Sequence, residues 1–320
     1  MENISLQPGG LPVKNEKKLE KIKRTFKREK HIWIICVPII LWVLLFCYYP
    51  MYGMLIAFFH YIPGKSILSC DWAGLFYFKQ FFNAPDFTNI LRNTLVISGL
   101  NLLFVFPAPI ILALLISELK SKWFKKTVQT ISYLPYFISW VVAASLIYTF
   151  LSSDGIFTTL LHKLGLIHGE ISILGEGKYF WAIITSANLW KSIGWSSILY
   201  LSAIAGIDKE LYDAAEVDGV GRFGKVWHVT LPGIRPTIVL LLILQIGSIL
   251  NAGFEQQLLL GSPQTREYWD VIDTYAYRYG IQLGRYSYGM AIGLIKSVIG
   301  LTLVFGANRL CKKFLDVSVI

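Results

Sequence analysis

The chain has 320 residues, of which 54% are hydrophobic and only 16% are charged, whereas a soluble domain carries about 25% charged residues. This composition excludes a soluble enzyme, a disordered chain and a collagen-like repeat, and it indicates a membrane protein. The net charge of +10 is typical of a membrane protein whose basic residues gather in cytoplasmic loops. The four cysteines show no CxxC or Cys/His spacing, so neither a zinc site nor a disulfide framework is indicated.

Six long apolar stretches follow one another along the chain, each with at most one charged residue. Each is long enough for a helix to cross the hydrocarbon core of a bilayer, which is about 30 Å thick. The first contains Pro50, near which we expect it to tilt or break. The sequence therefore predicts an all-α integral membrane protein with transmembrane helices at residues 31–59, 94–117, 130–151, 179–207, 236–260 and 286–308.

The basic residues alternate between the segments that join these helices. Twenty lie in segments 1–31, 119–130, 207–235 and 309–320, and only eight lie in segments 60–92, 153–178 and 261–285. Because positive flanks are retained on the cytoplasmic side, both termini are predicted to be cytoplasmic. The N-terminal segment is not expected to be a cleavable signal, because its apolar run is far longer than that of a signal peptide.

These features divide the chain into three predicted parts. Residues 1–31 form a basic cytoplasmic segment, suited to the anionic inner leaflet. Residues 32–311 form the transmembrane domain, which includes the cytoplasmic loop at 207–235. Residues 312–320 form a cytoplasmic tail.

The loop at residues 207–235 is the most informative part of the sequence. Residues 210–217 suit a helix, and Gly219 with Gly221 suits its end and a turn. A second helical segment from Arg222 is expected to stop before Pro232. The sequence thus predicts a helix-turn-helix on the cytoplasmic membrane face, where Ala214 and Ala215 allow another backbone to approach closely.

The spacing within this loop resembles that of the membrane-spanning permeases of bacterial ABC importers, in the carbohydrate branch of the maltose-transporter type. Their signature is EAA, three residues, Gly, nine residues and then I-x-L-P. At the same spacing the chain has Asp213-Ala214-Ala215, Gly219 and Val229-Thr230-Leu231-Pro232. It departs from the signature in Asp213 for Glu and Val229 for Ile. Residues 74–95 also look like this branch, and residues 271–300 look like its subgroup for complex oligosaccharides.

The resemblance implies the type I ABC importer permease fold, with six transmembrane helices and a cytoplasmic coupling helix. It also implies that residues 213–221 dock into a groove on a cytoplasmic ATPase subunit, with Leu211, Tyr212 and Val217 as apolar anchors. Closure of the ATPase pair then switches the membrane cavity between its inward-facing and outward-facing states. The residues implied for ATPase coupling are Asp213, Ala214, Ala215, Glu216, Asp218, Gly219, Leu231 and Pro232.

The chain is not expected to be an enzyme. Its one phosphate-loop-like match, Gly64-Lys65-Ser66, has Phe59 where the first glycine of GxxxxGK[ST] belongs. No catalytic residue, metal or cofactor is therefore predicted in this chain, and ATP and Mg²⁺ are expected in separate ATPase subunits. The partners implied are a second permease, normally a paralogue, two cytoplasmic ATPase subunits, an extracytoplasmic solute-binding protein, the carbohydrate and membrane lipid; no nucleic acid is expected.

Charged residues inside membrane helices are costly and indicate function by default. Lys191, Glu255 and Lys296 are the three such residues, and if they face the bundle interior, Glu255 is placed to pair with one of the lysines. The alternative for each lysine is an extended side chain that reaches the interface. Aromatic and amide side chains nearby suit a carbohydrate pathway, although such residues also simply pack helices. The pathway residues predicted are Trp190, Lys191, Trp195, Asn251, Glu255, Gln256 and Lys296.

The outer loops are the expected dock of the solute-binding protein, with Arg266, Tyr268, Trp269 and Asp270 as rim candidates. Two other classes compete with an ATP-driven importer of oligosaccharides in the bacterial cell membrane. An intramembrane enzyme lacks paired carboxylates or HExxH within the spans. A carrier driven by an ion gradient needs intramembrane acidic residues, of which Glu255 is the only one.

Overall fold

The computed structural model describes residues 30–165 and 173–315, and every regular element within them is a helix. The prediction of an all-α protein is confirmed. The chain forms two units, Met1–Leu55 and Ile56–Ile320. Most of the expected basic segment 1–31 and residues 316–320 of the expected tail lie outside the described residues.

The first unit is built around α2 (Lys30–Val43), which continues through a π-helical turn at Leu44–Tyr48. The winding changes to a 3-10 helix at Tyr49–Phe58, where Pro50 cannot supply the N–H that an α-helical turn needs. None of the α2 side chains is buried within the protein. A helix that is apolar all round and uncovered is suited to lipid or to another membrane subunit.

Four further stretches of the described chain are long and apolar enough to cross a membrane. They are Phe87–Ser117, Trp140–Leu160, Arg222–Gly247 and Tyr286–Lys313, which with Lys30–Phe58 makes five among the described residues. The sixth expected span corresponds to α9 (Phe180–Ala205), a helix of 26 residues. Its length is about 39 Å at 1.5 Å per residue, so it is long enough to cross a membrane. Its polar residues give it a lower mean hydropathy than the other five stretches.

The third expected span, at residues 130–151, is not one continuous helix. α6 (Lys122–Tyr133) gives way to a 3-10 turn at Leu134–Phe137, and α7 (Trp140–Leu151) starts after an extended residue. Pro135 lacks the N–H for an α-helical bond, and Ser139 caps α7 by accepting from the Val142 N–H. Hydropathy alone does not detect such a break, because Leu134, Tyr136 and Phe137 are themselves apolar.

The fifth expected span, at residues 236–260, is wrong at both ends. The helix starts earlier, with α11 (Arg222–Lys225), a π-helical turn at Val226–Thr230 and α12 (Leu231–Gly247). It then stops, and α13 (Glu255–Leu260) follows an irregular segment in which Gly253 has φ +95°. Non-helical backbone at membrane depth is tolerated where protein or a polar cavity covers it.

Prolines explain two of the irregular turns inside the long helices. α4 (Phe87–Leu100) passes through a π-helical turn at Asn101–Val105 before α5 (Pro107–Ser117). The turn at Val226–Thr230 precedes Pro232 in the same way. A widened turn accommodates the missing N–H and the ring of the following proline, so each helix continues instead of ending. The expectation that the helix from Arg222 stops before Pro232 is therefore wrong.

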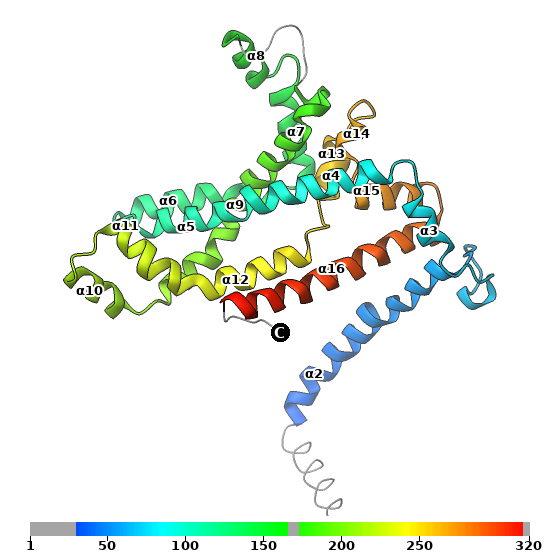
Figure 1. The fold of residues 1–320 in the computed structure, drawn as a ribbon, viewed down its shortest axis with the longest axis horizontal. Helices are drawn as coiled ribbons and strands as arrows, with labels where there is room; N and C mark the ends of the chain where they lie inside the picture. Colours follow the sequence, from blue (N-terminus) through cyan, green and yellow to red (C-terminus); the bar gives the residue numbers. More distant parts are fainter. Residues whose placement is uncertain (1–29, 166–172, 316–320) are drawn as a thin grey trace, which may run out of the picture. The chain divides into compact units, whose positions relative to one another are not determined.

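Within the second unit, α9 contacts α5, α6 and α12, and α12 lies against α16 (Tyr286–Leu315). A Cβ at Gly300 would lie 3.0 Å from the Gly247 carbonyl oxygen, so the backbones of α12 and α16 approach closely. In Figure 1, α10 (Lys209–Val217) and α11 lie at one end of these helices, and α3 (Phe76–Phe82) and α15 (Ile272–Tyr277) lie at the other. The loop predicted to be cytoplasmic is thus far from the loops predicted to be outer.

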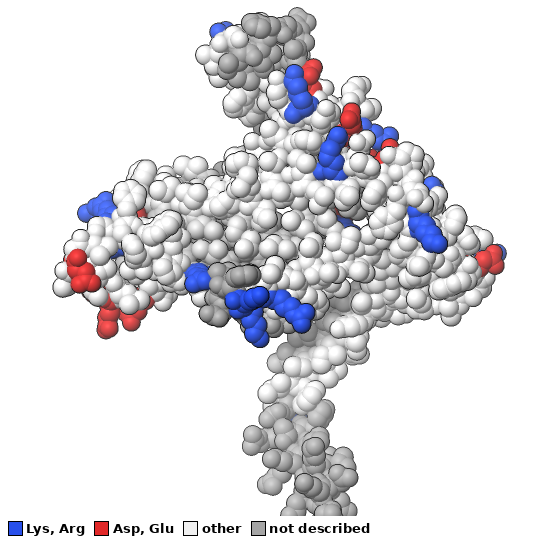
Figure 2. All heavy atoms as spheres, viewed as in Figure 1, with Lys and Arg blue, Asp and Glu red and all other residues white. Residues whose placement is uncertain are grey.

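The buried core is divided among several small clusters. One joins α4, α7, α9 and α13 through Ile97, Ala144, Ile184 and Leu260, and a second joins α3, α4, α15 and α16. Many large apolar side chains remain exposed, and the surface where Figure 1 places α5 and the middle of α9 shows few charged atoms in Figure 2. Such a surface is suited to lipid and partner helices rather than to water.

Candidate functional site: the elbow at 208–232 and the polar interior

The loop predicted to couple to an ATPase folds into a capped helix and a turn. Asp208 caps α10 by accepting from the Glu210 N–H at 3.0 Å. At the other end the N–H of Val220 donates to the Ala215 carbonyl and that of Gly219 donates to the Glu216 carbonyl. This is the Schellman pattern of helix termination, and it places Gly219 at φ +72°. We call residues 208–232 the elbow.

Two side-chain contacts hold the elbow closed. The Tyr212 hydroxyl lies 3.0 Å from Thr230 Oγ1, and Lys225 Nζ lies 2.6 Å from Glu216 Oε2. The Lys225 ammonium holds the pKa of the Glu216 carboxyl below its usual value, so the ion pair persists at neutral pH and is lost only as the pH falls through that lowered pKa. The two arms of the elbow are therefore linked by two side-chain contacts.

Most residues predicted for ATPase coupling are exposed on the surface of the elbow. Asp213, Ala214, Glu216, Asp218, Gly219 and Pro232 are exposed, and Leu231 is half-buried. Ala215 is buried, so of the two alanines only Ala214 allows the approach of another backbone.

The apolar anchors of the elbow differ in part from those expected. Tyr212 points back to Thr230, whereas Val217 is 88% exposed and Phe223, which the sequence reading missed, is 92% exposed. A large apolar side chain at such exposure within a charged loop is the signal that makes Phe223 a candidate anchor. Acidic atoms gather in Figure 2 at the end where Figure 1 places α10.

Three amides form a chain inside the helix bundle. Asn188 Nδ2 donates to Asn101 Oδ1 at 3.2 Å, and Gln256 Nε2 donates to Asn188 Oδ1 at 3.3 Å. They line a cavity of about 260 Å³ together with Lys191, Ser192 and Gln245. Ser192 and Gln245 also line a second cavity of about 310 Å³, which shares Ser248 with a third. The predicted residues Lys191 and Gln256 are thus brought to one polar cavity.

The Lys191 ammonium donates hydrogen bonds to the irregular backbone between α6 and α7. It donates to the carbonyls of Pro135 at 3.4 Å and Tyr136 at 2.9 Å, and also to that of Ile138. These carbonyls lie where the helix is interrupted, and only that of Pro135 also accepts a described backbone N–H, from Ile138. The sequence predicts Lys191 as a pathway residue, and the structure shows that it also stabilises this irregular backbone.

The two tryptophans predicted for the pathway lie in different surroundings. Trp195 stacks on Tyr136 with ring centroids 4.6 Å apart, beside the Lys191 site. Trp190 instead lines an apolar cavity of about 730 Å³ with residues of α7, α8 (Ile156–Lys163) and α9. The structure does not bring Trp190 and Trp195 together.

The third cavity, of about 450 Å³, contains the predicted residues Asn251 and Lys296. Lys296 pairs with Asp273 of α15, a residue that the sequence reading did not single out because it lies outside the apolar stretches. Glu255 is exposed at the start of α13. Within the described residues its carboxylate attracts the Lys191 ammonium without a direct ion pair, so the expected pairing is present only as a longer-range attraction.

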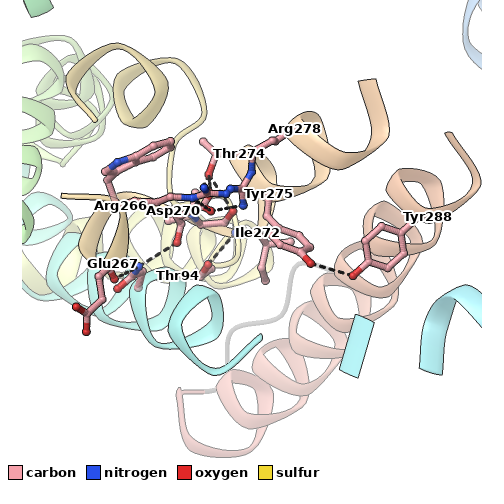
Figure 3. A network of polar contacts seen from close by, with 12 residues as sticks. Thr94, Arg266, Glu267, Asp270, Ile272, Thr274, Tyr275, Arg278 and Tyr288 are labelled. Atoms are coloured by element: carbon pink, nitrogen blue, oxygen red, sulfur yellow. Dashed lines mark hydrogen bonds and ion pairs between the residues drawn. The ribbon is translucent and has the colours of Figure 1, made fainter. Parts of the chain in front are cut away.

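Asp270 was expected on the rim of the outer loops but is buried. Arg278 and Arg266 pair with it at 2.5 Å and 3.5 Å, and the Thr274 hydroxyl donates to it at 2.7 Å. Figure 3 shows this network between the loop and α4, where Thr94 accepts from the Ile272 N–H. Burial raises the pKa of the Asp270 carboxyl, and the Thr274 and Arg266 hydrogen bonds oppose that shift. The network fixes α15 to the bundle.

The comparison with known families identifies the chain. A family model described as binding-protein-dependent transport system inner membrane component matches residues 106–315. The chain belongs to this family. The resemblance inferred from the loop at 207–235 is thereby confirmed, and the protein is a permease subunit of a binding-protein-dependent ABC transporter.

Two relatives from Bacillus subtilis (strain 168) are similar over nearly the whole permease. Protein LplB is 47% identical over 290 residues, which cover 90% of each chain. The polygalacturonan/rhamnogalacturonan transport system permease protein YteP is 43% identical over 302 residues, which cover 93% of each chain.

Solved structures show the same fold. The crystal structure of a bacterial ABC transporter involved in the import of the acidic polysaccharide alginate contains a chain that is 41% identical to this permease. It superposes with a TM-score of 0.84 over 92% of this chain and 99% of that chain. The same values hold for the alginate transporter in complex with its alginate pentasaccharide-bound periplasmic protein. The predicted permease fold is confirmed.

Proposed function

We propose that this permease forms half of the pathway of an ATP-driven importer of oligosaccharides that carry carboxylate groups. The observation that carries the substrate class is its similarity to two kinds of acid-sugar transporter. YteP is named for polygalacturonan and rhamnogalacturonan, and the alginate importer is named for an acidic polysaccharide. Identities of 43% and 41% over more than nine-tenths of this chain support a related cargo.

The elbow is proposed to dock into a groove on a cytoplasmic ATPase subunit. Val217 and Phe223 are exposed apolar anchors on either side of the turn, and Asp213, Glu216 and Asp218 surround them with charge. An exposed apolar centre with a polar rim is typical of a reversible protein interface. The Glu216–Lys225 ion pair supports transmission of movement, because it keeps the two arms of the elbow together.

The proposed assembly contains a second permease, normally a paralogue, two ATPase subunits and an extracytoplasmic binding protein. ATP and Mg²⁺ belong to the ATPase subunits in this proposal, and the permease itself needs no cofactor. The complex with a substrate-bound periplasmic protein formed by the alginate importer supports a binding protein here. Both termini of this inner-membrane component are proposed to lie in the cytoplasm, in agreement with the excess of basic residues in segments 1–31 and 309–320.

The pathway is proposed to follow the polar cavities beside α12. These are lined by Asn188 and Gln256 at one side and by Asn251 and Lys296 at the other. Amides suit sugar hydroxyls, and an ammonium suits a sugar carboxylate. The remaining predicted pathway residues Trp190, Trp195 and Glu255 keep that role only as proposals.

Uptake by the reconstituted transporter tests the proposal. Proteoliposomes carry the assembled transporter, with the binding protein and labelled oligogalacturonate or oligoalginate outside. We expect uptake with internal ATP and none with an imposed Na⁺ or H⁺ gradient in its absence. Uptake that follows an ion gradient without ATP would establish the carrier alternative, and ATP-driven uptake of neutral oligosaccharides alone would refute the acidic cargo.

A further inference from the structure

The third cavity, at the C-terminal end of α12, is lined by the Asp273–Lys296 ion pair. Asp273 lies in the first turn of α15, where the helix dipole favours a negative charge. Lys296 lies ten residues into α16 and within its apolar stretch. The side chains are 24% and 19% exposed, so both charged groups reach the cavity instead of being sealed in the core.

The walls of this cavity offer further polar groups to a ligand. Ser248 and Asn251 come from the irregular segment after α12, and Ser297 comes from α16. Hydroxyls, an amide and an ammonium are groups that bind an acidic sugar.

The carboxylates of Asp270, just before α15, and Asp273, within α15, differ in how firmly they are held. Asp270 is 7% exposed in its side chain and is bonded by Arg278, Arg266 and Thr274 (Figure 3). Asp273, in contrast, is bonded by Lys296 alone within residues 30–165 and 173–315, and Lys296 forms its one described hydrogen bond with Asp273. An ammonium has three N–H donors, so Lys296 has capacity for a second acceptor.

We infer that Asp273 acts as a stand-in for the carboxylate of the substrate, and that Lys296 is the residue that selects acidic sugars. In the empty pathway the Asp273 carboxylate neutralises Lys296, which avoids the cost of a lone charge at membrane depth. A passing sugar carboxylate binds the free N–H donors of the ammonium and shares Lys296 with Asp273. Because the neighbouring Asp273 carboxylate repels the bound anion, binding is weak enough to release the cargo. This inference rests on the proposed acidic cargo.

Charge-changing variants of the assembled transporter separate this role from a structural one. The measurements are uptake of labelled oligogalacturonate or oligoalginate at saturating binding protein, and co-purification of the subunits. We expect Lys296→Arg to retain uptake, because the charge remains. We expect Asp273→Asn to retain or increase uptake, because the competing carboxylate is gone.

The double variant Lys296→Met with Asp273→Asn is the decisive one, because it leaves no unpaired charge in the membrane. It is expected to assemble normally but to lose uptake about ten- to a hundredfold, the factor associated with a hydrogen bond to a charged group. If the double variant transports like the unmodified protein, the pair only neutralises itself and the inference is refuted. A loss with Asp273→Asn as large as that of the double variant, in an assembled transporter, also refutes it.

Asp270→Asn provides the matched control in the sealed ion pair. It is expected to reduce assembly, because Arg278 and Arg266 lose their buried partner. Failure of the proposed cargo is recognised separately, because the unmodified transporter then takes up no acidic oligosaccharide at all.

Discussion

At the scale of single residues, the two lysines inside the helices show how a membrane protein satisfies a buried ammonium. Lys191 binds backbone carbonyls released by a helix break, and Lys296 binds a carboxylate across a cavity. The sequence identified both as unusual, since a charge at membrane depth requires a partner. It did not identify the partners, because Pro135 and Asp273 are 56 and 23 residues away and meet the lysines only after the helices pack.

Replacing Lys191 by Met tests its structural task. The variant keeps most of the apolar volume but removes the Lys191 donor from the carbonyls of Tyr136 and Ile138 and from that of Pro135, which keeps the Ile138 N–H. Each lost hydrogen bond costs about 0.5–1.5 kcal/mol, so the unfolding temperature of the detergent-solubilised transporter should fall, as measured by thermal denaturation. Lys191→Arg supplies donors again and should melt close to the unmodified protein. Unchanged melting of Lys191→Met together with lost uptake would assign Lys191 to the pathway alone.

At the scale of elements, the elbow depends on a backbone conformation that its sequence specifies directly. Gly219 stands where the Schellman turn needs a positive φ, and Asp208 stands where α10 needs a cap. Both follow from local rules, and the sequence predicted the turn at Gly219 but did not single out Asp208. The continuation of the helix from Arg222 was not predicted, because a π-helical turn allows Pro232 to sit inside a continuing helix.

Two substitutions at Gly219 separate backbone strain from side-chain bulk. A Cβ added at this position would have no neighbouring atom within 4 Å, so no clash within the chain is expected. A left-handed conformation costs a β-branched residue at least about 1–2 kcal/mol, whereas Asn tolerates it. Gly219→Val should therefore weaken co-purification of the ATPase subunit and ATP-driven uptake, and Gly219→Asn should retain both. If both variants retain co-purification and uptake, the conformation of this turn is not what the ATPase recognises; if both lose them equally, side-chain bulk and not backbone strain is the cause.

At the scale of the whole molecule, the second unit places the elbow and the α14–α15 loop at opposite ends of the long helices (Figure 1). This arrangement agrees with the alternation of basic and less basic segments along the sequence. It also separates the two proposed docking surfaces, one for an ATPase and one for a binding protein.

Cysteine labelling tests the sidedness of these two ends. In a background whose four native cysteines are replaced by serine, Asp218→Cys and Glu267→Cys introduce exposed thiols at the elbow and at α14 (Arg266–Trp269). A membrane-impermeant maleimide should label Glu267→Cys in intact protoplasts and Asp218→Cys only after permeabilisation. Labelling of both positions from outside would contradict the predicted topology.

The sequence by itself determined the membrane class and the turn of the elbow, and it predicts the sidedness. Apolar length, loop charge and the Asp213-to-Pro232 spacing are local properties that folding does not alter. The tertiary structure decided where the long helices break and which polar groups meet. Both depend on distant partners: Lys191 stabilises a break that hydropathy does not reveal, and Asp273, from a loop outside every apolar stretch, pairs with a lysine in the sixth expected span.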